Sequence, residues 1–174
     1  MALGSVFDLH VHTTAGSPDS SLTPEELVTE AHRIGLDGAL LTEHNGWPRH
    51  DFELFIPHEK VILIRALEIY TNIGHVIAIG LDSYSSGVFH IEELRRVVDI
   101  AGGYMILAHP FRFLFDPAGF YTQNLLYEDP KTLPKTPQEA AGHYVFPLVD
   151  ELEVVNGGNI ETENRFAQGV AEHL

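Results

Sequence analysis

Cysteine is absent from this chain of 174 residues. Without cysteine the chain can form neither a disulfide bond nor a thiolate metal site, so its metal ligands would have to be histidines and carboxylates. Basic residues are scarce as well, with ten Lys and Arg against 25 Asp and Glu and a formal net charge of -15. Such a surface does not favour binding to nucleic acid by counterion release, and we expect no stable nucleic-acid complex.

Long apolar runs are also absent. No segment is long and uncharged enough to span a bilayer, and the N-terminal residues lack the basic region and the apolar run of a signal peptide. We therefore expect a cytoplasmic protein with no membrane partner. Because 44% of the residues are hydrophobic, the chain can bury one core, and we expect a single domain over residues 1–174.

Histidine, in contrast, is abundant, with 11 residues. Near the start of the chain Asp8, His10 and His12 alternate with Leu9 and Val11, as in a β-strand, where residues two apart share a face. We predict that these three polar side chains point the same way. Two imidazoles two residues apart can hold one divalent metal ion, and buried imidazoles are costly without such a partner. The alternative is a solvated edge strand.

Two further histidines follow apolar segments that are typical of buried strands. His44 comes after residues 38–42, and His109 comes directly after residues 104–108. In α/β barrels the functional side chains stand at the carboxyl ends of such strands. Both histidines are therefore candidate ligands.

Glu68 is an acidic residue within the apolar segment 61–69. A buried carboxylate needs a cationic partner, and a metal ion is one that can stabilise it. A turn follows, and we expect His75 to face Glu68 across it. The alternative is a simple ion pair between Glu68 and Arg65 or Arg112.

Helical spacing predicts three helices, at residues 24–34, at 90–101 and from residue 161 onward. The loop 13–22 carries Asp19, which could reach back to the end of the first strand. Residues 46–60 have no regular pattern. Residues 111–147 are also aperiodic, and we interpret them as an insertion over the barrel mouth, a lid or substrate wall from which Arg112 could contact an anionic group.

Strands and helices that alternate with short connections predict an α/β fold, a (β/α) barrel with its site at one rim. Five imidazoles and one or two carboxylates exceed the three or four ligands of one tetrahedral ion, so two or three ions are implied. Nitrogen and oxygen ligands without sulfur suit zinc, manganese or iron. Such clusters activate a bound water and clamp a phosphoryl group, which the negative charge of the chain does not exclude.

Four ordered motifs resemble those of the PHP (polymerase and histidinol phosphatase) family: Asp8-Leu-His-Val-His-Thr, Thr42-Glu-His-Asn, Glu68 with His75, and Ala108-His-Pro. The resemblance runs from about Val6 to the end of the chain. It implies a distorted (β/α)7 TIM-like barrel with two or three divalent ions that hydrolyse phosphate esters. It also implies a small stand-alone phosphoesterase whose partner is a small phosphorylated substrate, a nucleotide or a short oligonucleotide.

The resemblance assigns seven metal ligands: His10, His12, Asp19, His44, Glu68, His75 and His109. Five of these are expected at the catalytic centre: His10, His12, His44, Glu68 and His109. Arg112 is the candidate substrate contact, and Asp8 and Asn156 match positions near the site that are not usually ligands. The family also has a Gly-Ser-Asp-x-His motif after its final helix, and this sequence stops at Leu174 before such a motif. We therefore expect either a truncated sequence or an incomplete site.

Two other functions remain open from the sequence. One is a non-catalytic, metal-binding accessory module, as when a PHP-like domain supports a polymerase. The other is an amidohydrolase-type, metal-dependent hydrolase, because His-x-His on a first strand also opens the sites of those barrels. The second is disfavoured because none of the three lysines, Lys60, Lys131 and Lys135, ends a predicted strand.

Overall fold

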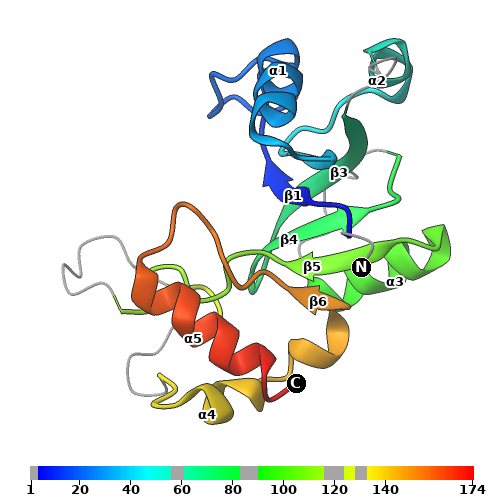
Figure 1. The fold of residues 1–174 in the computed structure, drawn as a ribbon. Coiled ribbons are helices and arrows are strands. Elements are labelled where there is room, and N and C mark those ends of the chain that lie inside the picture. Colours follow the sequence, from blue (N-terminus) through cyan, green and yellow to red (C-terminus); the bar gives the residue numbers. More distant parts are fainter. Residues whose placement is uncertain (1–3, 56–60, 83–89, 116–123, 128–132) are drawn as a thin grey trace.

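The structure is a computed structural model that describes residues 4–55, 61–82, 90–115, 124–127 and 133–174. Within these ranges six strands form one sheet, in which the spatial order equals the chain order. The strands are β1 (Phe7–Val11), β2 (Gly38–Glu43), β3 (Ile62–Thr71), β4 (Gly74–Ile79), β5 (Tyr104–Leu107) and β6 (Glu151–Leu152). Figure 1 shows the sheet running through the middle of the molecule.

Both parallel and antiparallel pairs occur in the sheet. β1, β2 and β3 are parallel, β4 is antiparallel to β3 and to β5, and β5 is parallel to β6. The sheet curls into a half-barrel, so the predicted α/β class is confirmed. Among the described residues no strand pairs with the outer edge of β1 or β6, and a groove of about 810 Å³ lies between these two edges. A closed barrel of seven strands is therefore not shown.

Helices cover the outer side of the sheet in two groups. They are α1 (Pro24–Ile34), α2 (Arg49–Phe55), α3 (Ile91–Ala101), α4 (Pro137–Ala141), the 3-10 helix η2 (Phe146–Leu148) and α5 (Glu161–Ala171). In Figure 1, α1 and α2 lie at the end of the molecule that carries β1, and α4 and α5 lie at the opposite end, near β6. All three predicted helices are present. None of the helices in the described ranges is both long enough and apolar enough to cross a membrane.

The segment 46–60, predicted to be irregular, contains the helix α2. Trp47 packs its ring against Phe52 and Phe55, with ring centroids 5.4 Å and 5.2 Å apart. Trp47 and Phe52 are buried in the cluster that joins α1 and α2 to β2. The prediction was wrong there because a helix of two turns shows too little periodicity in sequence.

The inner face of the curled sheet is packed with apolar side chains rather than hollow. Leu40, Ala66, Ile77, Ile106 and Ala108 form this layer, which brings together β2, β3, β4 and β5. A separate and larger cluster packs α3, α4 and α5 against the other side. Glu68 lies on the same face of β3 as Ala66, two residues closer to the carboxyl end of the strand.

The predicted insertion 111–147 is only partly described, because residues 116–123 and 128–132 lie outside the described ranges. The described parts contain α4 and η2, and Phe111 is fully buried in the main core. Its placement as an insertion over the barrel mouth stays a prediction.

Candidate metal centre

The candidate site lies at one edge of the sheet because five of its six strands run in the same direction. β1, β2, β3 and β5 are mutually parallel through the pairings of the sheet, so their carboxyl ends share an edge. His10 and His12 stand at the end of β1, His44 follows β2, and His109 follows β5 by two residues. Residues from different strands meet at this edge, as the sequence predicts.

Glu68, on β3, is the centre of this arrangement. Five imidazoles each place a ring nitrogen within 3.4 Å of one of its carboxylate oxygens: His10, His12, His44, His75 and His109. The side chain of Glu68 is 2% exposed. Burial by itself raises the pKa of Glu68, but hydrogen bonds from His10 and His109 outweigh it and hold the pKa below its usual range. The carboxylate is therefore ionised.

Within the described part of the chain, no arginine pairs with Glu68. The guanidinium of Arg65 binds the carbonyl and the carboxylate of Asp82, at 2.7 Å and 3.0 Å. The guanidinium of Arg112 donates to Asn156 Oδ1 at 2.7 Å. Both cations are engaged elsewhere, so the alternative of an Arg–Glu68 ion pair is wrong.

Glu68 and His75 meet across the β3–β4 hairpin. Glu68 is paired in register with Ile77, and His75 lies two residues away on the same face of β4. His75 Nδ1 is 2.8 Å from Glu68 Oε1, and His109 Nε2 is 2.9 Å from the same oxygen. The predicted contact across the turn is present.

The histidine nitrogens also face one another. The Nε2 atoms of His10 and His12 are 3.2 Å apart, and the rings of His12 and His44 stack with centroids 4.5 Å apart. Imidazoles that converge around one carboxylate offer their lone pairs to a common cation. This donor set, nitrogen and oxygen without sulfur, fits divalent zinc, manganese or iron.

Four overlapping groups of three residues could each hold an ion, with ligand atoms within 4.8 Å of one another. The groups are His10, His12 and Glu68; Glu68, His75 and His109; His12, Asp19 and His44; and His10, His109 and Glu153. Glu68 and His12 each belong to two of the first three groups. A ligand shared by two groups could bind two neighbouring ions. The number of ions stays a prediction.

Asp19 reaches back to the site from its loop, as predicted. Its Oδ2 atom is 3.2 Å from His44 Nε2, although the side chain is 59% exposed. The loop returns because Ser17 and Thr13 bind Glu43 beneath it. All seven predicted ligands are therefore brought together, and their roles as ligands remain predictions.

Asp8 differs from the two histidines of its strand. A bulge in the pairing of β1 with β2 lies between Asp8 and Val11, and it interrupts the alternation of side chains. Asp8 is exposed, and its carboxylate accepts the backbone N–H of His10 at 3.0 Å. It belongs to none of the candidate ion sites among the described residues.

The two buried histidines beside Glu153 differ in basicity. Burial lowers the pKa of His10, but hydrogen bonds with Glu153 and Glu68 outweigh it and raise the pKa to about 9. Burial lowers the pKa of His109, and the positive charge of Arg112 lowers it further, against the opposing hydrogen bond with Glu68. A metal ion bound here must displace the proton of His10, so its binding would weaken as the pH falls.

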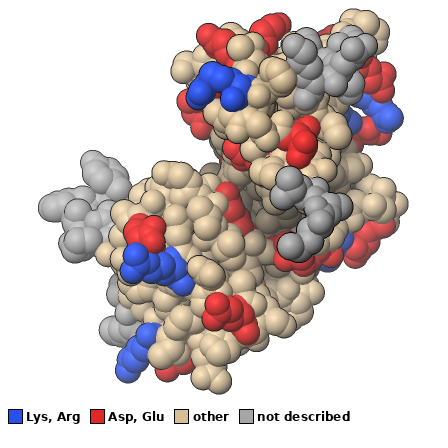
Figure 2. Space-filling view, in the orientation of Figure 1, with Lys and Arg blue, Asp and Glu red and all other residues tan. Residues whose placement is uncertain are grey.

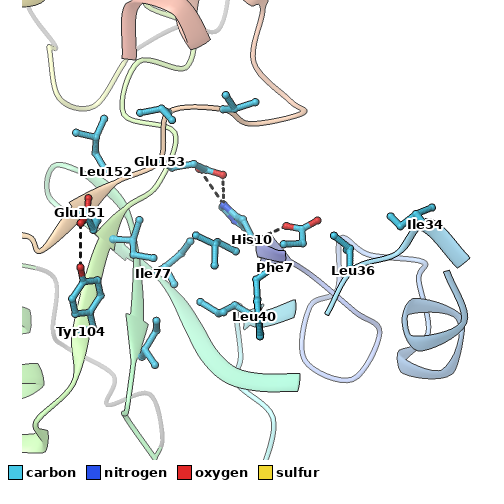
Figure 3. Close-up of a pocket in the computed structure, with 16 residues that line it drawn as sticks. Phe7, His10, Ile34, Leu36, Leu40, Ile77, Tyr104, Glu151, Leu152 and Glu153 are labelled. Carbon is cyan, nitrogen blue, oxygen red and sulfur yellow. Dashed lines mark hydrogen bonds and ion pairs between the residues drawn. The ribbon is translucent and has the colours of Figure 1, made fainter. Parts of the chain in front are cut away.

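Two carboxylates near the site were not assigned a role from the sequence. Glu153 places both oxygens 3.2 Å from His10 Nδ1 (Figure 3). Glu43 is fully buried and accepts the hydroxyl of Ser17 at 2.5 Å, and Ser17 Oγ lies 3.2 Å from His12 Nδ1. Glu43 ends the buried strand β2, which was the available signal for it, whereas the short strand β6 before Glu153 gives no such signal.

Arg112 lies beside the cluster. Its guanidinium donates to Asn156 and to Asn159 Oδ1, the latter at 3.1 Å, and the side chain is half-buried. A pocket of about 150 Å³ is lined by Arg112 together with His75 and His109. The cation is thus held next to the candidate ligands.

No protein-family profile and no curated protein sequence matches the chain. Solved structures do share its fold. One is a protein from Bifidobacterium adolescentis that is named a putative metal-dependent phosphoesterase. Its TM-score is 0.56 at 16% identity, and the match covers 98% of this chain and 85% of that chain. Another is PsfC from Pseudomonas syringae, with a TM-score of 0.54 at 15% identity over 96% of this chain and 72% of that chain.

A two-domain protein from Bacteroides vulgatus, named as containing a predicted PHP-like metal-dependent phosphoesterase, gives a TM-score of 0.49 at 26% identity. The match covers 87% of this chain and 44% of that one. At 16% and 15% identity, the neighbours from Bifidobacterium adolescentis and Pseudomonas syringae show a shared fold.

Proposed function

We propose that this chain is a metal-dependent phosphoesterase, a hydrolase of a phosphomonoester or phosphodiester. The observation that carries the proposal is the buried Glu68 carboxylate with five imidazole nitrogens within 3.4 Å of its oxygens. A nucleotide or a short oligonucleotide is the substrate class we propose. The name of the Bifidobacterium adolescentis neighbour supports the reaction type.

The proposed ligands are the seven residues of the cluster: His10, His12, Asp19, His44, Glu68, His75 and His109. Two or three zinc, manganese or iron ions held there would supply Lewis-acid activation of a water molecule and of the phosphoryl oxygens. The protein itself contributes the positions of the ligands and a cation for the substrate. Arg112 is that cation, because its guanidinium is held by Asn156 and Asn159 next to His109.

With a net charge of -15, the chain needs a local positive charge, such as bound metal ions and Arg112, to bind a phosphorylated substrate. Figure 2 shows Asp and Glu side chains on both parts of the molecule, on either side of a hollow. A phosphorylated substrate would be repelled by such a surface unless cations offset its negative charge locally.

The proposal also includes a complete (β/α)7 barrel as the fold and the cytoplasm as the location of the protein.

The test is hydrolysis of p-nitrophenyl phosphate and bis-p-nitrophenyl phosphate by protein loaded with manganese, zinc or iron. We expect turnover that requires metal and that Glu68→Gln abolishes together with most of the bound metal. Glu163→Gln is the control, because Glu163 is equally buried but caps the start of α5, away from the site.

Two results would replace the proposal. Tight metal binding without turnover of either ester would favour the accessory module. Metal-dependent cleavage of an amide substrate, with both esters left intact, would favour the amidohydrolase type.

A further inference from the structure

We propose that Glu153 is a positioning residue that fixes the ring of His10, so that the Nε2 lone pair of His10 points into the metal centre. The proposal rests on the metal binding contained in the proposed function. It concerns a carboxylate outside the seven ligands predicted from the motifs.

Glu153 connects the two ends of the sheet. It follows β6 directly, whereas His10 is on β1, and these are the outermost strands of the sheet. In Figure 3 the Glu153 side chain extends across the groove to the His10 ring. The two residues are 143 positions apart in the chain, and His10 Nδ1 is 3.2 Å from each carboxylate oxygen.

The carboxylate of Glu153 accepts hydrogen bonds at both of its oxygens. Its Oε2 atom accepts the backbone N–H of His109 at 2.7 Å, and its Oε1 atom accepts the amide of Asn156 at 2.8 Å. The ring of His10 is the third donor. A carboxylate that accepts hydrogen bonds at both oxygens orients its donors, as is common for the partners of metal-bound histidines.

The other nitrogen of His10 faces the cluster. His10 Nε2 is 3.3 Å from Glu68 Oε1 and 3.2 Å from His12 Nε2. A neutral imidazole has one N–H and one lone pair. With Nδ1–H donated to Glu153, the lone pair must lie on Nε2, directed at the position where Glu68 and His12 converge.

A competing assignment makes Glu153 a ligand together with His10 and His109. That assignment requires the lone pair of His10 to lie on Nδ1 instead. The proton on His10 Nε2 would then point at the Nε2 atom of His12. Neither of these two Nε2 atoms could then bind an ion beside Glu68. The contacts of Glu153 with His109 and Asn156 favour the positioning role.

Glu153 also ties the centre to the proposed phosphate contact. Asn156 donates its amide to Glu153 and accepts Arg112 through Oδ1, at 2.8 Å and 2.7 Å. The backbone of His109 is held by the same carboxylate, in a left-handed conformation with φ of 28°. One carboxylate thus orients the histidines of β1 and β5 and, through Asn156, the guanidinium of Arg112.

The test compares Glu153→Gln with Glu151→Gln. A glutamine at 153 offers one acceptor oxygen to three donor groups, so at least one of the contacts must be lost. Glu151 is two residues away and exposed, and its carboxylate accepts the hydroxyl of Tyr104 at 3.4 Å, which makes its variant a matched control.

Two measurements are made on each protein. Zinc affinity is measured by competition with a chromophoric chelator, and we expect about 10- to 100-fold weaker binding for Glu153→Gln and no change for Glu151→Gln. The tautomer of His10 is measured by long-range 1H–15N NMR on the zinc-loaded, 15N-histidine protein, with His10→Gln used to identify the signals. We expect zinc on Nε2 and a proton on Nδ1 in the wild type.

The proposal is overturned if Glu153→Gln binds zinc as tightly as the wild type, or if the wild-type spectrum shows zinc on Nδ1. The wild-type spectrum is decisive even where Glu153→Gln fails to fold, which circular dichroism reports. A wild type that shows the expected tautomer but hydrolyses no phosphate ester would refute the proposed function and leave the role of Glu153 supported.

Discussion

Among single residues, Glu68 shows most clearly why an ion fits this site. All its ion-pair partners in the described part of the chain are histidines. Without metal, the buried Glu68 carboxylate can be stabilised only by N–H groups of the five imidazoles, some of which must then be protonated and positively charged next to one another. A divalent cation supplies the positive charge and lets the rings be neutral ligands, which removes repulsion between protonated neighbours.

Arg112→Gln tests the proposed phosphate contact. We expect the KM for p-nitrophenyl phosphate to rise about tenfold or more, because a hydrogen bond to a charged group contributes about 1.5–3 kcal/mol. The zinc content should not change, since Arg112 is not a ligand. Steady-state kinetics and elemental analysis check both expectations.

Arg33→Gln is the control for this variant, because Arg33 forms an exposed ion pair with Glu30 on α1. An unchanged KM in Arg112→Gln would remove Arg112 from the substrate site.

On the scale of the elements, the loop between β1 and α1 is held in place by close packing. A side chain at Gly16 would meet the backbone oxygen of Gly46 and Cβ of Glu43, each at 2.6 Å. The loop carries Asp19, so its path decides whether that carboxylate reaches His44. The packing beneath the loop thus positions a candidate ligand at its tip.

Gly16→Ala should therefore destabilise the protein by about 1–3 kcal/mol, the usual cost of overpacking a tight contact. The free energy of unfolding in urea measures this loss. Gly4→Ala is a suitable comparison, because nothing lies within 4 Å of a side chain placed at Gly4. Equal stability of the two variants would show that the loop can shift freely.

Asp150, which comes directly before β6, connects α3 with β5. Its Oδ2 atom accepts the N–H of Met105 and the guanidinium of Arg95, each at 2.7 Å. Partial burial raises the pKa of Asp150, but these hydrogen bonds outweigh it and lower the pKa below its usual value of 3.8. The ionised carboxylate therefore stabilises the folded state above pH 3.8, and this contribution is lost as the pH falls through the lower, folded pKa.

Asp150→Asn should lower the free energy of unfolding at pH 7 by roughly 1 kcal/mol and make stability less dependent on pH in the acid range. Urea unfolding at pH 7 and in the acid range provides the measurement. Asp99→Asn serves for comparison, because Asp99 pairs with the same Arg95 but is 63% exposed. An acid-range dependence that persists unchanged in Asp150→Asn would contradict the assignment.

At the scale of the whole molecule, the candidate metal centre brings together parts that are distant in the sheet. Its candidate ligands come from β1 and the segment after β2 on one side and from the segment after β5 on the other. Ions held by both sides would resist separation of the two ends of the half-barrel. Metal binding should therefore stabilise the fold.

Removal of metal with a chelator should lower the Tm, and added zinc should restore it. Zinc at 100 times its Kd would contribute about 2.7 kcal/mol, which corresponds to about 5–10 °C for a chain of this size. Calorimetry with chelator, with zinc and with magnesium as the comparison ion tests this expectation. A Tm that does not respond to zinc would argue against an ion shared by the two sides.

The sequence by itself determined the local elements. The predicted helix 24–34 is present as α1, where Thr23 and Glu26 form a capping box and Gly35 ends the helix with φ of 83°. The buried strands and the polar residues at their ends were also readable, because strand patterns, caps and turns depend on neighbours within a few positions. The shared direction of β1, β2 and β5 accounts for the approach of His10, His44 and His109, whereas His75 arrives across the β3–β4 hairpin and Asp19 on a loop.

Only the tertiary structure decided the partners of those ligands. Nothing local indicates that Glu153 reaches His10, or that Glu43 is linked to His12 through Ser17. Glu153 and His10 are 143 positions apart, and Glu43 and Ser17 are 26 positions apart, so both contacts depend on packing between segments that are distant in the chain. The donors were therefore fixed by local sequence, whereas their orientation depends on how the two ends of the sheet approach each other in space.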